Sequence, residues 1–215
     1  IIDIVSDVVC PWCYVGKKRL EQALVKVPQP GLEITWRPYR LNPEMPDEGM
    51  DRKAYMRAKF GDEKGSGAHE RLVEIGREVG IPFAFDRIKR APNTLRAHRL
   101  MRHAERAGRQ NELAEALFRA YFIDGQDIGD SEALAAIAAG IGLDRDEALA
   151  YLVSDADVEA IRAEDQYARE IGIQGVPCYI IDRRYALSGA QPPEAFIHVF
   201  DIASQPDDKD KAELA

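Results

Sequence analysis

The chain has 215 residues, of which 46% are hydrophobic and 31% are charged, and its formal net charge at pH 7 is −8. This acidic balance disfavours nucleic acids and anionic membrane surfaces as partners. No stretch approaches the roughly 20 apolar residues of a membrane-spanning helix. Three cysteines are too few for a disulfide-stapled secreted scaffold, and the length suits one large domain or a core with a sizeable insertion.

The first elements predict a βαβ unit. Residues 1–5 are nearly all apolar and β-branched, which is typical of a strand buried on both faces. Residues 11–27 carry apolar side chains at helical spacing, and residues 32–39 alternate between apolar and polar, as in a half-exposed strand. A strand, a helix and a strand in this order predict parallel strands with a right-handed crossover.

From about residue 51 to residue 171 the apolar periodicity predicts one helix after another. Asn93, either Asp130 or Ser131, and Asp144 are suitable N-cap residues for three of these helices. A helical segment of this length cannot be a loop. We therefore expect a second layer or a cap domain that is built into the first one.

Strand character returns at residues 178–182 and 185–189, which a short turn joins into a hairpin, and residues 192–203 follow as a helix. The sequence therefore predicts one four-stranded sheet. In this sheet residues 1–5 and 178–182 form the central strands, and residues 32–39 form an edge strand.

The predicted domain organisation is discontinuous. Residues 1–45 and 172–205 form the α/β core, and residues 46–171 form an inserted all-helical domain. Residues 206–215 are a charged tail that we expect to fray.

Cys10 and Cys13 form a CPWC motif at the start of the first predicted helix. A structural disulfide at this spacing closes too short a loop to contribute much stability. A metal site needs about four ligands, and neither a second CxxC nor a histidine pair at ligand spacing is present, although a metal bridged between two subunits stays open. A redox dithiol suits the position best, because a helix N-terminus stabilises a thiolate.

In this interpretation Cys10 is the exposed nucleophile, and Cys13 stays protonated until it resolves a mixed disulfide. Val176 and Pro177 come directly before the third predicted strand, where proline cannot supply a ladder hydrogen bond. A cis Val176–Pro177 bond would make a tight turn there and face Cys10. An ordinary trans proline that opens a strand is the alternative.

Three further side chains have two interpretations each. Cys178 is expected to point into the core, away from Cys10, with a regulatory thiol as the alternative. Asp7 either caps backbone N–H groups, which we favour, or accepts the proton of Cys13. Trp12 either contacts the substrate or covers the dithiol.

The segments DVVCPWCYVG, LNPEMPDEG, RAPNTLRAHRL and GIQGVPCYIIDRRYALSGAQPPEAF together resemble the DsbA-like thioredoxin superfamily, and within it the FrnE-like dithiol oxidoreductases. The resemblance covers nearly the whole chain. It implies an α/β thioredoxin-like fold (βαβ…ββα) with a large inserted all-helical domain. It also implies Cys10 as the nucleophile, Cys13 as the resolving thiol and Val176–Pro177 as a cis-proline loop. Our candidate substrate-binding residues are Pro11, Trp12, Val176 and Pro177.

Two related groups carry serine in place of Cys10 and bind glutathione: the kappa-class glutathione transferases and the 2-hydroxychromene-2-carboxylate isomerases. Their Ser-Asp-Arg signature near the last helix is missing here, where the sequence is SGAQPPE. Both differences favour redox chemistry. DsbA itself has Pro-His between its cysteines, and because Trp12 cannot stabilise a thiolate as histidine can, the resemblance implies a weaker oxidant.

We therefore expect a cytoplasmic thiol-disulfide oxidoreductase acting on protein or small-molecule thiols and disulfides. No signal peptide is visible, although one removed before residue 1 stays open. No bound cofactor or metal is expected; glutathione is a candidate cosubstrate, and a homodimer is compatible with the sequence. One alternative is a glutathione-dependent isomerase or transferase acting on an aromatic or polyketide-like molecule. Another is a non-enzymatic dithiol or metal-linked binding module.

Overall fold

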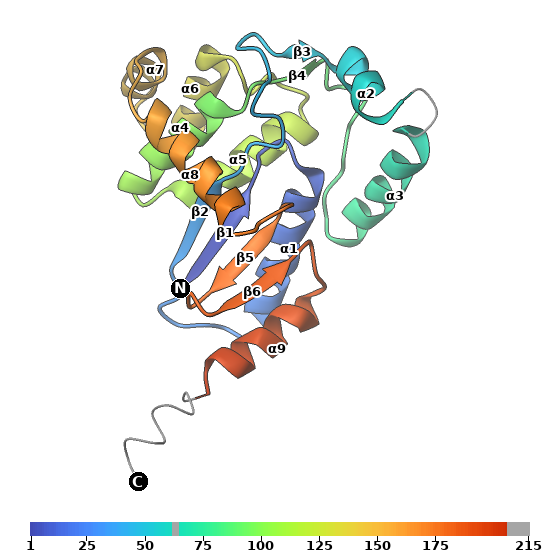
Figure 1. The fold of residues 1–215 in the computed structure, drawn as a ribbon, viewed down its shortest axis with the longest axis vertical. Coiled ribbons are helices and arrows are strands. Elements are labelled where there is room, and N and C mark those ends of the chain that lie inside the picture. Colours follow the sequence, from blue (N-terminus) through green and yellow to red (C-terminus); the bar gives the residue numbers. More distant parts are fainter. Residues whose placement is uncertain (62–64, 206–215) are drawn as a thin grey trace.

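The structure is a computed structural model that describes residues 1–61 and 65–205 (Figure 1). The predicted charged tail at residues 206–215 lies outside the described residues. Within the described part of the chain, no helix has both the length and the apolar character that crossing a membrane requires.

A four-stranded sheet in the order β2-β1-β5-β6 forms the centre of the molecule. β1 runs parallel to β2 and antiparallel to β5, which forms a hairpin with β6. The prediction of two central strands, with the second strand of the chain at an edge, is therefore confirmed. The strands are β1 (Ile2–Ser6), β2 (Ile34–Pro38), β5 (Cys178–Ile181) and β6 (Tyr185–Ser188).

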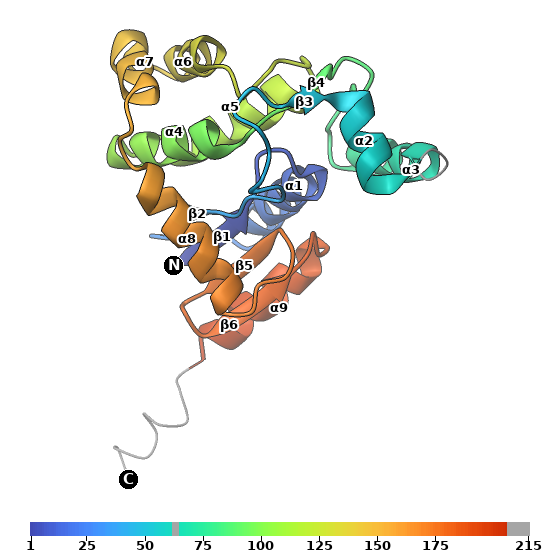
Figure 2. The same cartoon turned by 45° about the horizontal axis from the view of Figure 1, so that its top comes forward.

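Helices cover both faces of this sheet (Figure 2). Side chains alternate along a strand, so Ile4 of β1 packs into the main core, whereas its neighbour Val5 belongs to a small cluster on the other face. β1 is therefore buried on both faces, as its sequence predicts. The helices α1 (Pro11–Lys26) and α9 (Pro193–Ala203) cover one face, and α8 (Val158–Glu170) covers the other.

The long segment between β2 and β5 is mostly helical, as predicted. Asp130 and Asp144 cap α6 and α7, since their carboxylates accept the backbone N–H groups of residues 133 and 147 at 2.8 Å. The helices between β2 and α8 are α2 (Arg52–Phe60), α3 (Gly65–Glu78), α4 (Leu95–Arg106), α5 (Gln110–Phe122), α6 (Ser131–Gly140) and α7 (Arg145–Val153).

Two details of this segment differ from the prediction. A short antiparallel ladder joins β3 (Met50–Asp51) to β4 (Arg90–Ala91), and strands of two residues are too short to show an alternating pattern. α4 takes Thr94, not Asn93, as its N-cap residue. The Asn93 carboxamide still accepts the N–H of Leu95 at 3.0 Å, and it also ties α4 to the loop at Met45 by donating to the Met45 carbonyl at 2.7 Å.

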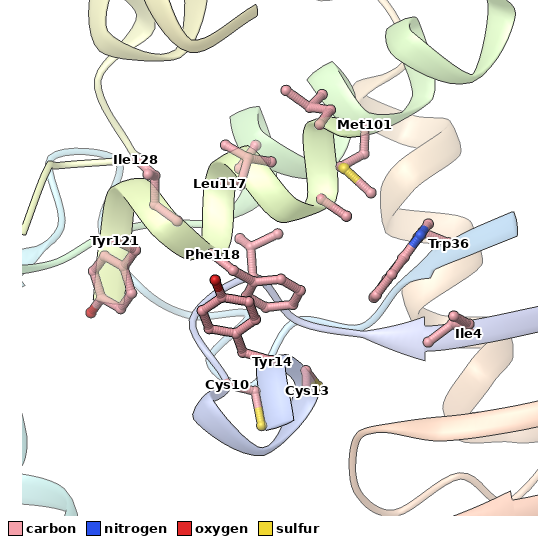
Figure 3. Packing of buried hydrophobic residues seen from close by; sticks show 14 of the residues in the cluster. Ile4, Cys10, Cys13, Tyr14, Trp36, Met101, Leu117, Phe118, Tyr121 and Ile128 are labelled. Atoms are coloured by element: carbon pink, nitrogen blue, oxygen red, sulfur yellow. The ribbon is translucent and has the colours of Figure 1, made fainter. Parts of the chain in front are cut away.

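α5 fixes the helical segment to the helix that carries the two cysteines (Figure 3). The rings of Tyr14 in α1 and Phe118 in α5 stack with centroids 5.1 Å apart, and Trp36 of β2 meets Phe118 edge-on at 5.9 Å. The Tyr14 hydroxyl donates to Glu115 at 2.8 Å. One hydrophobic core therefore runs from the sheet through α1 into the helical segment. This shared core fixes the start of α1 against the helical segment.

Candidate active site

Cys10 occupies the N-terminus of α1. It is the N-cap residue, its backbone is extended, and Pro11 follows as the first helical residue. The Cys10 N–H donates to the Asp7 carbonyl at 3.0 Å, which closes the turn that follows β1. The first turn of α1 carries no acidic side chain, and Cys10 lies at the positive end of the helix dipole.

The Cys10 thiol meets the segment that precedes β5. Its Sγ lies 3.6 Å from the Val176 carbonyl oxygen, 166 residues away in the sequence. The Val176–Pro177 peptide bond is cis. Pro177 packs on α1, where a Cβ placed at Gly16 would lie 3.1 Å from the Pro177 Cγ. The sheet thus brings the two predicted halves of the site together.

Cys13 lies behind Cys10, one helical turn further along α1 (Figure 3). Burial raises the pKa of the Cys13 thiol well above its ordinary value, and its hydrogen bond and electrostatic interaction with Cys10 raise it further. The Ser6 side chain and the Asp7 backbone act in the opposite direction. All three cysteines are free thiols in this structure. Because its pKa is raised, Cys13 holds its proton and can react only after losing it.

The expectation that the Cys10 side chain is exposed is wrong, although Cys10 is the more accessible of the two thiols. Cys10 is 5% exposed and Cys13 is 1% exposed, so both side chains are buried. They differ in access, because Cys10 lines a cavity of about 440 Å³ that Cys13 does not reach. Residues of the inserted segment form part of the wall of this cavity, a long-range arrangement that the position of Cys10 in the sequence does not reveal.

This cavity has a mainly apolar wall, to which the helical segment contributes. Trp12, which is 37% exposed, lines it, together with Pro11 and Val176. Arg52 and Lys59 of α2 supply its cationic groups. Its larger apolar side chains are Trp12, Leu41, Met45, Met56, Leu72, Phe85, Tyr121, Phe122 and Val176.

Asp7 also lines the cavity, and it is paired with a histidine that the sequence did not single out. One Asp7 carboxylate oxygen accepts the N–H of Leu41 at 2.8 Å, so Asp7 does cap backbone, although in a segment far along the chain. The other oxygen lies 3.3 Å from the His98 Nε2, and both side chains are buried. The sequence shows no histidine pair, so only the fold could reveal this partner.

Cys178 lies on the opposite face of the sheet. It belongs to the cluster of Val5, Tyr39 and Ala168, under α8, which confirms that it points away from Cys10. Burial raises the pKa of this thiol. Among residues 1–61 and 65–205, no group of three or more His, Cys, Asp or Glu side chains could hold a metal ion.

The family model of the DSBA-like thioredoxin domain matches residues 1–201. The chain belongs to the DSBA-like thioredoxin domain family. The crystal structure of a probable DsbA oxidoreductase, SCO1869 from Streptomyces coelicolor, is similar to this DSBA-like chain with a TM-score of 0.87 and 32% identity, covering 96% of this chain and 91% of its own. The uncharacterized protein YwbO of Bacillus subtilis is 27% identical over 186 residues, which are 84% of this chain and 86% of YwbO.

A more distant structure shares the fold. The cytosolic disulfide reductase DsbM from Pseudomonas aeruginosa, solved with GSH, has a TM-score of 0.66 and 19% identity and covers 94% of this chain and 98% of its own. The thioredoxin-like fold with a helical insertion, expected from the resemblance, is confirmed. This DSBA-like chain is a member of a thiol oxidoreductase family.

Proposed function

We propose that this DSBA-like chain exchanges disulfides through its CPWC dithiol, with Cys10 as the nucleophile and Cys13 as the resolving thiol. The observation that carries the proposal is the different access of the two thiols. Cys10 caps α1, faces the Val176 carbonyl and lines the large cavity, whereas Cys13 is closed off behind it. A substrate sulfur in the cavity can therefore meet only Cys10.

The reaction proceeds in two exchange steps. In the reducing direction, the Cys10 thiolate attacks one sulfur of the substrate disulfide, the substrate S–S bond breaks, and the other sulfur leaves with the electron pair. Cys13 then loses its proton and attacks the Cys10 sulfur, so that the Cys10–Cys13 disulfide forms and the second substrate sulfur leaves. Two electrons pass from the dithiol to the substrate. The same steps in reverse oxidise a substrate dithiol.

The cavity favours a substrate that carries an apolar group next to the reacting sulfur. Its aromatic and aliphatic wall offers burial to such a group, and each Å² of apolar surface removed from water contributes about 25 cal/mol. Arg52 and Lys59 can meet a carboxylate at the same time. Glutathione, which carries two carboxylates, is therefore our candidate for a small-molecule cosubstrate, beside thiols of proteins.

The test compares Cys13→Ser and Cys10→Ser with the parent in turnover of a disulfide substrate. Cys10→Ser should lose all dithiol chemistry. Cys13→Ser should lose turnover and accumulate a mixed disulfide on Cys10, which mass spectrometry detects, because a single thiol cannot release itself.

The alternative function, a glutathione-dependent isomerase or transferase, gives the opposite pattern in the same experiment. Only the residue at the helix N-terminus then contacts the glutathione thiolate, so Cys13 is a spectator. A parent without dithiol turnover, together with a Cys13→Ser variant fully active on a glutathione-dependent substrate, would replace the redox function with this alternative.

A further inference from the structure

A second cavity lies between α8 and the segment that follows β2. It is an open groove of about 510 Å³, and it shares one wall residue, Met45, with the cavity that Cys10 lines. Two contacts join its sides: the Arg40 N–H donates to the Asp165 carboxylate at 2.9 Å, and the Arg169 guanidinium donates to the Arg40 carbonyl at 2.6 Å. The groove is therefore built into the fold, and neither cysteine of the CPWC motif lines it.

Arg40 is the unusual side chain of this groove. It is 6% exposed, and arginines are rarely buried so completely unless they are paired. Its guanidinium donates to the Pro43 carbonyl at 2.9 Å and to the Asn93 carboxamide at 3.3 Å, and both of these partners are uncharged. Among the described residues no carboxylate forms an ion pair with Arg40, and its Nε has no hydrogen-bond partner.

The other two arginines of the groove have acidic partners. Arg162 lies 2.7 Å from the Glu159 carboxylate, and Arg169 lies 3.0 Å from that of Asp165. Burial lowers the pKa of Arg40, and the attraction of nearby carboxylates does not fully offset this effect. Because a buried charge without a counter-ion is costly, an anion in the groove would be stabilised by the charge that it neutralises.

The rim of the groove limits the kind of anion that fits. Glu44 and Asp47 line the groove, and both are exposed. Within residues 1–61 and 65–205 Glu44 forms no ion pair, and Asp47 reaches only Arg96, at 4.0 Å. A phosphate dianion would be repelled by these carboxylates, whereas an ammonium group would be attracted. The apolar side chains of the groove are Pro43, Met45 and Leu95.

We propose that this groove binds a free α-amino acid with an apolar side chain. The carboxylate of the amino acid pairs with Arg40, its ammonium group lies toward Glu44 and Asp47, and its side chain packs on the apolar wall. The site takes no part in disulfide exchange, and the inference does not depend on the dithiol chemistry.

Calorimetric titration of the reduced protein with L-leucine tests the site. Two analogues separate the charges of the ligand, because N-acetyl-L-leucine lacks the ammonium group and L-leucinamide lacks the carboxylate. Arg40→Gln and Glu44→Gln remove the two partners on the protein. Arg52→Gln is the matched control, since it removes a cation from the neighbouring cavity that Cys10 lines. Melting temperatures verify that each variant folds.

We expect leucine to bind the parent, and Arg40→Gln to weaken this binding by about 10- to 100-fold, the effect of losing a hydrogen bond between charged groups. Glu44→Gln should weaken it by up to about 5-fold, because the ion pair is exposed. Leucinamide should bind the parent and Arg40→Gln equally weakly, since it lacks the group that Arg40 recognises. Arg52→Gln should bind leucine as the parent does.

Parental affinity for leucine in Arg40→Gln would overturn the proposal, as would the absence of binding to the parent at about 10 mM leucine. Binding that is lost in Arg52→Gln would place leucine in the neighbouring cavity instead. Equal binding of leucine and N-acetyl-L-leucine would show a simple anion site and overturn the assignment to an amino acid. If Arg40→Gln does not fold, Glu44→Gln and the two analogues decide. None of these results alters the disulfide turnover that tests the proposed function.

Discussion

The α1 face and the α8 face of the central sheet each bury a cysteine thiol, and they surround it differently. Cys13, in α1, packs beside Cys10, Ser6 and the backbone of Asp7. Cys178, on the other face, lies among apolar side chains of the small cluster under α8. Burial raises the pKa of both thiols, but at Cys178 burial is the sole cause.

The comparison leads us to expect that a thiol with burial alone, such as Cys178, is unreactive. Desolvation disfavours the thiolate on both faces, so the two faces are best distinguished by what accompanies burial. On the α1 face a second thiol, Cys10, lies at a helix N-terminus and lines a cavity, and polar groups approach Cys13. Cys178 has none of these neighbours, although it lies next to Pro177 in the sequence.

Alkylation of the reduced protein tests most directly whether the thiols on the two faces differ in reactivity. Cys10 should react first with iodoacetamide, because it lines the large cavity. Cys178 should react at least about 1,000-fold more slowly, since reaching it requires opening that costs on the order of 5 kcal/mol. Mass spectrometry of timed samples checks the order, and labelling in denaturant is the control for intrinsic reactivity. Equal labelling of Cys178 and Cys10 in the folded protein would refute the distinction.

The sheet could be predicted from the sequence because its signals are local. The alternation of β2 and the continuous apolar pattern of β1 each reflect how many faces of a strand are buried. The hairpin of β5 and β6 has a short turn between two apolar segments. Local patterns of this kind also place Asp130 and Asp144 at helix starts, since a cap depends on N–H groups only three residues away.

The site could be predicted only in part, because its cavity and one of its residue pairs depend on contacts between segments far apart in the sequence. The cysteines and Val176 are visible as motifs, but the cavity that Cys10 lines is built partly from α2 and α3, far along the chain. The Asp7–His98 pair joins a turn after β1 to a helix far along the chain. No periodicity or spacing relates these residues, so only the packing of α4 against the sheet could show that they meet.

A second test concerns how tightly the α1 face is packed. A Cβ at Gly16 would overlap the buried Tyr179 hydroxyl and press on Pro177, so Gly16→Ala should lower the free energy of unfolding by about 1–3 kcal/mol, the usual cost of overpacking. Chemical denaturation of the reduced protein measures this change.

A matched pair of variants identifies the cause. The Tyr179 hydroxyl has no hydrogen-bond partner among the described residues, so Tyr179→Phe should be neutral or slightly stabilising. It should also recover much of the stability lost in Gly16→Ala, because it removes the overlapping atom. If the double variant is as unstable as Gly16→Ala alone, the hydroxyl is not the obstacle and the close packing of α1 on β5 has another origin.

The smallest expected effect concerns the α8 face and depends on pH. Burial raises the pKa of Cys178 in the folded chain, so as pH rises the thiol ionises first in the unfolded chain. Its contribution to stability is therefore fully present below about pH 8.5, the value of an unperturbed cysteine, and is lost as pH rises toward the folded pKa. One thiol can lower the free energy of unfolding by up to about 1.4 kcal/mol per pH unit in this window.

Cys178→Ala removes this one titrating group and leaves Cys13 in place. The free energy of unfolding of the reduced parent and variant is measured at several pH values from 7 to about 9.5, below the range where tyrosines ionise. Near pH 7 it should change with pH in the same way in both proteins. Above about pH 8.5 the free energy of unfolding should fall more steeply with pH in the parent than in Cys178→Ala. The difference in slope should be at most that of one proton, about 1.4 kcal/mol per pH unit. Identical slopes over the whole range would mean that the Cys178 thiol ionises as freely in the folded chain as in the unfolded one. The small apolar cluster would then not seal it from water, and the difference between the two faces would lie in their polar neighbours and not in burial.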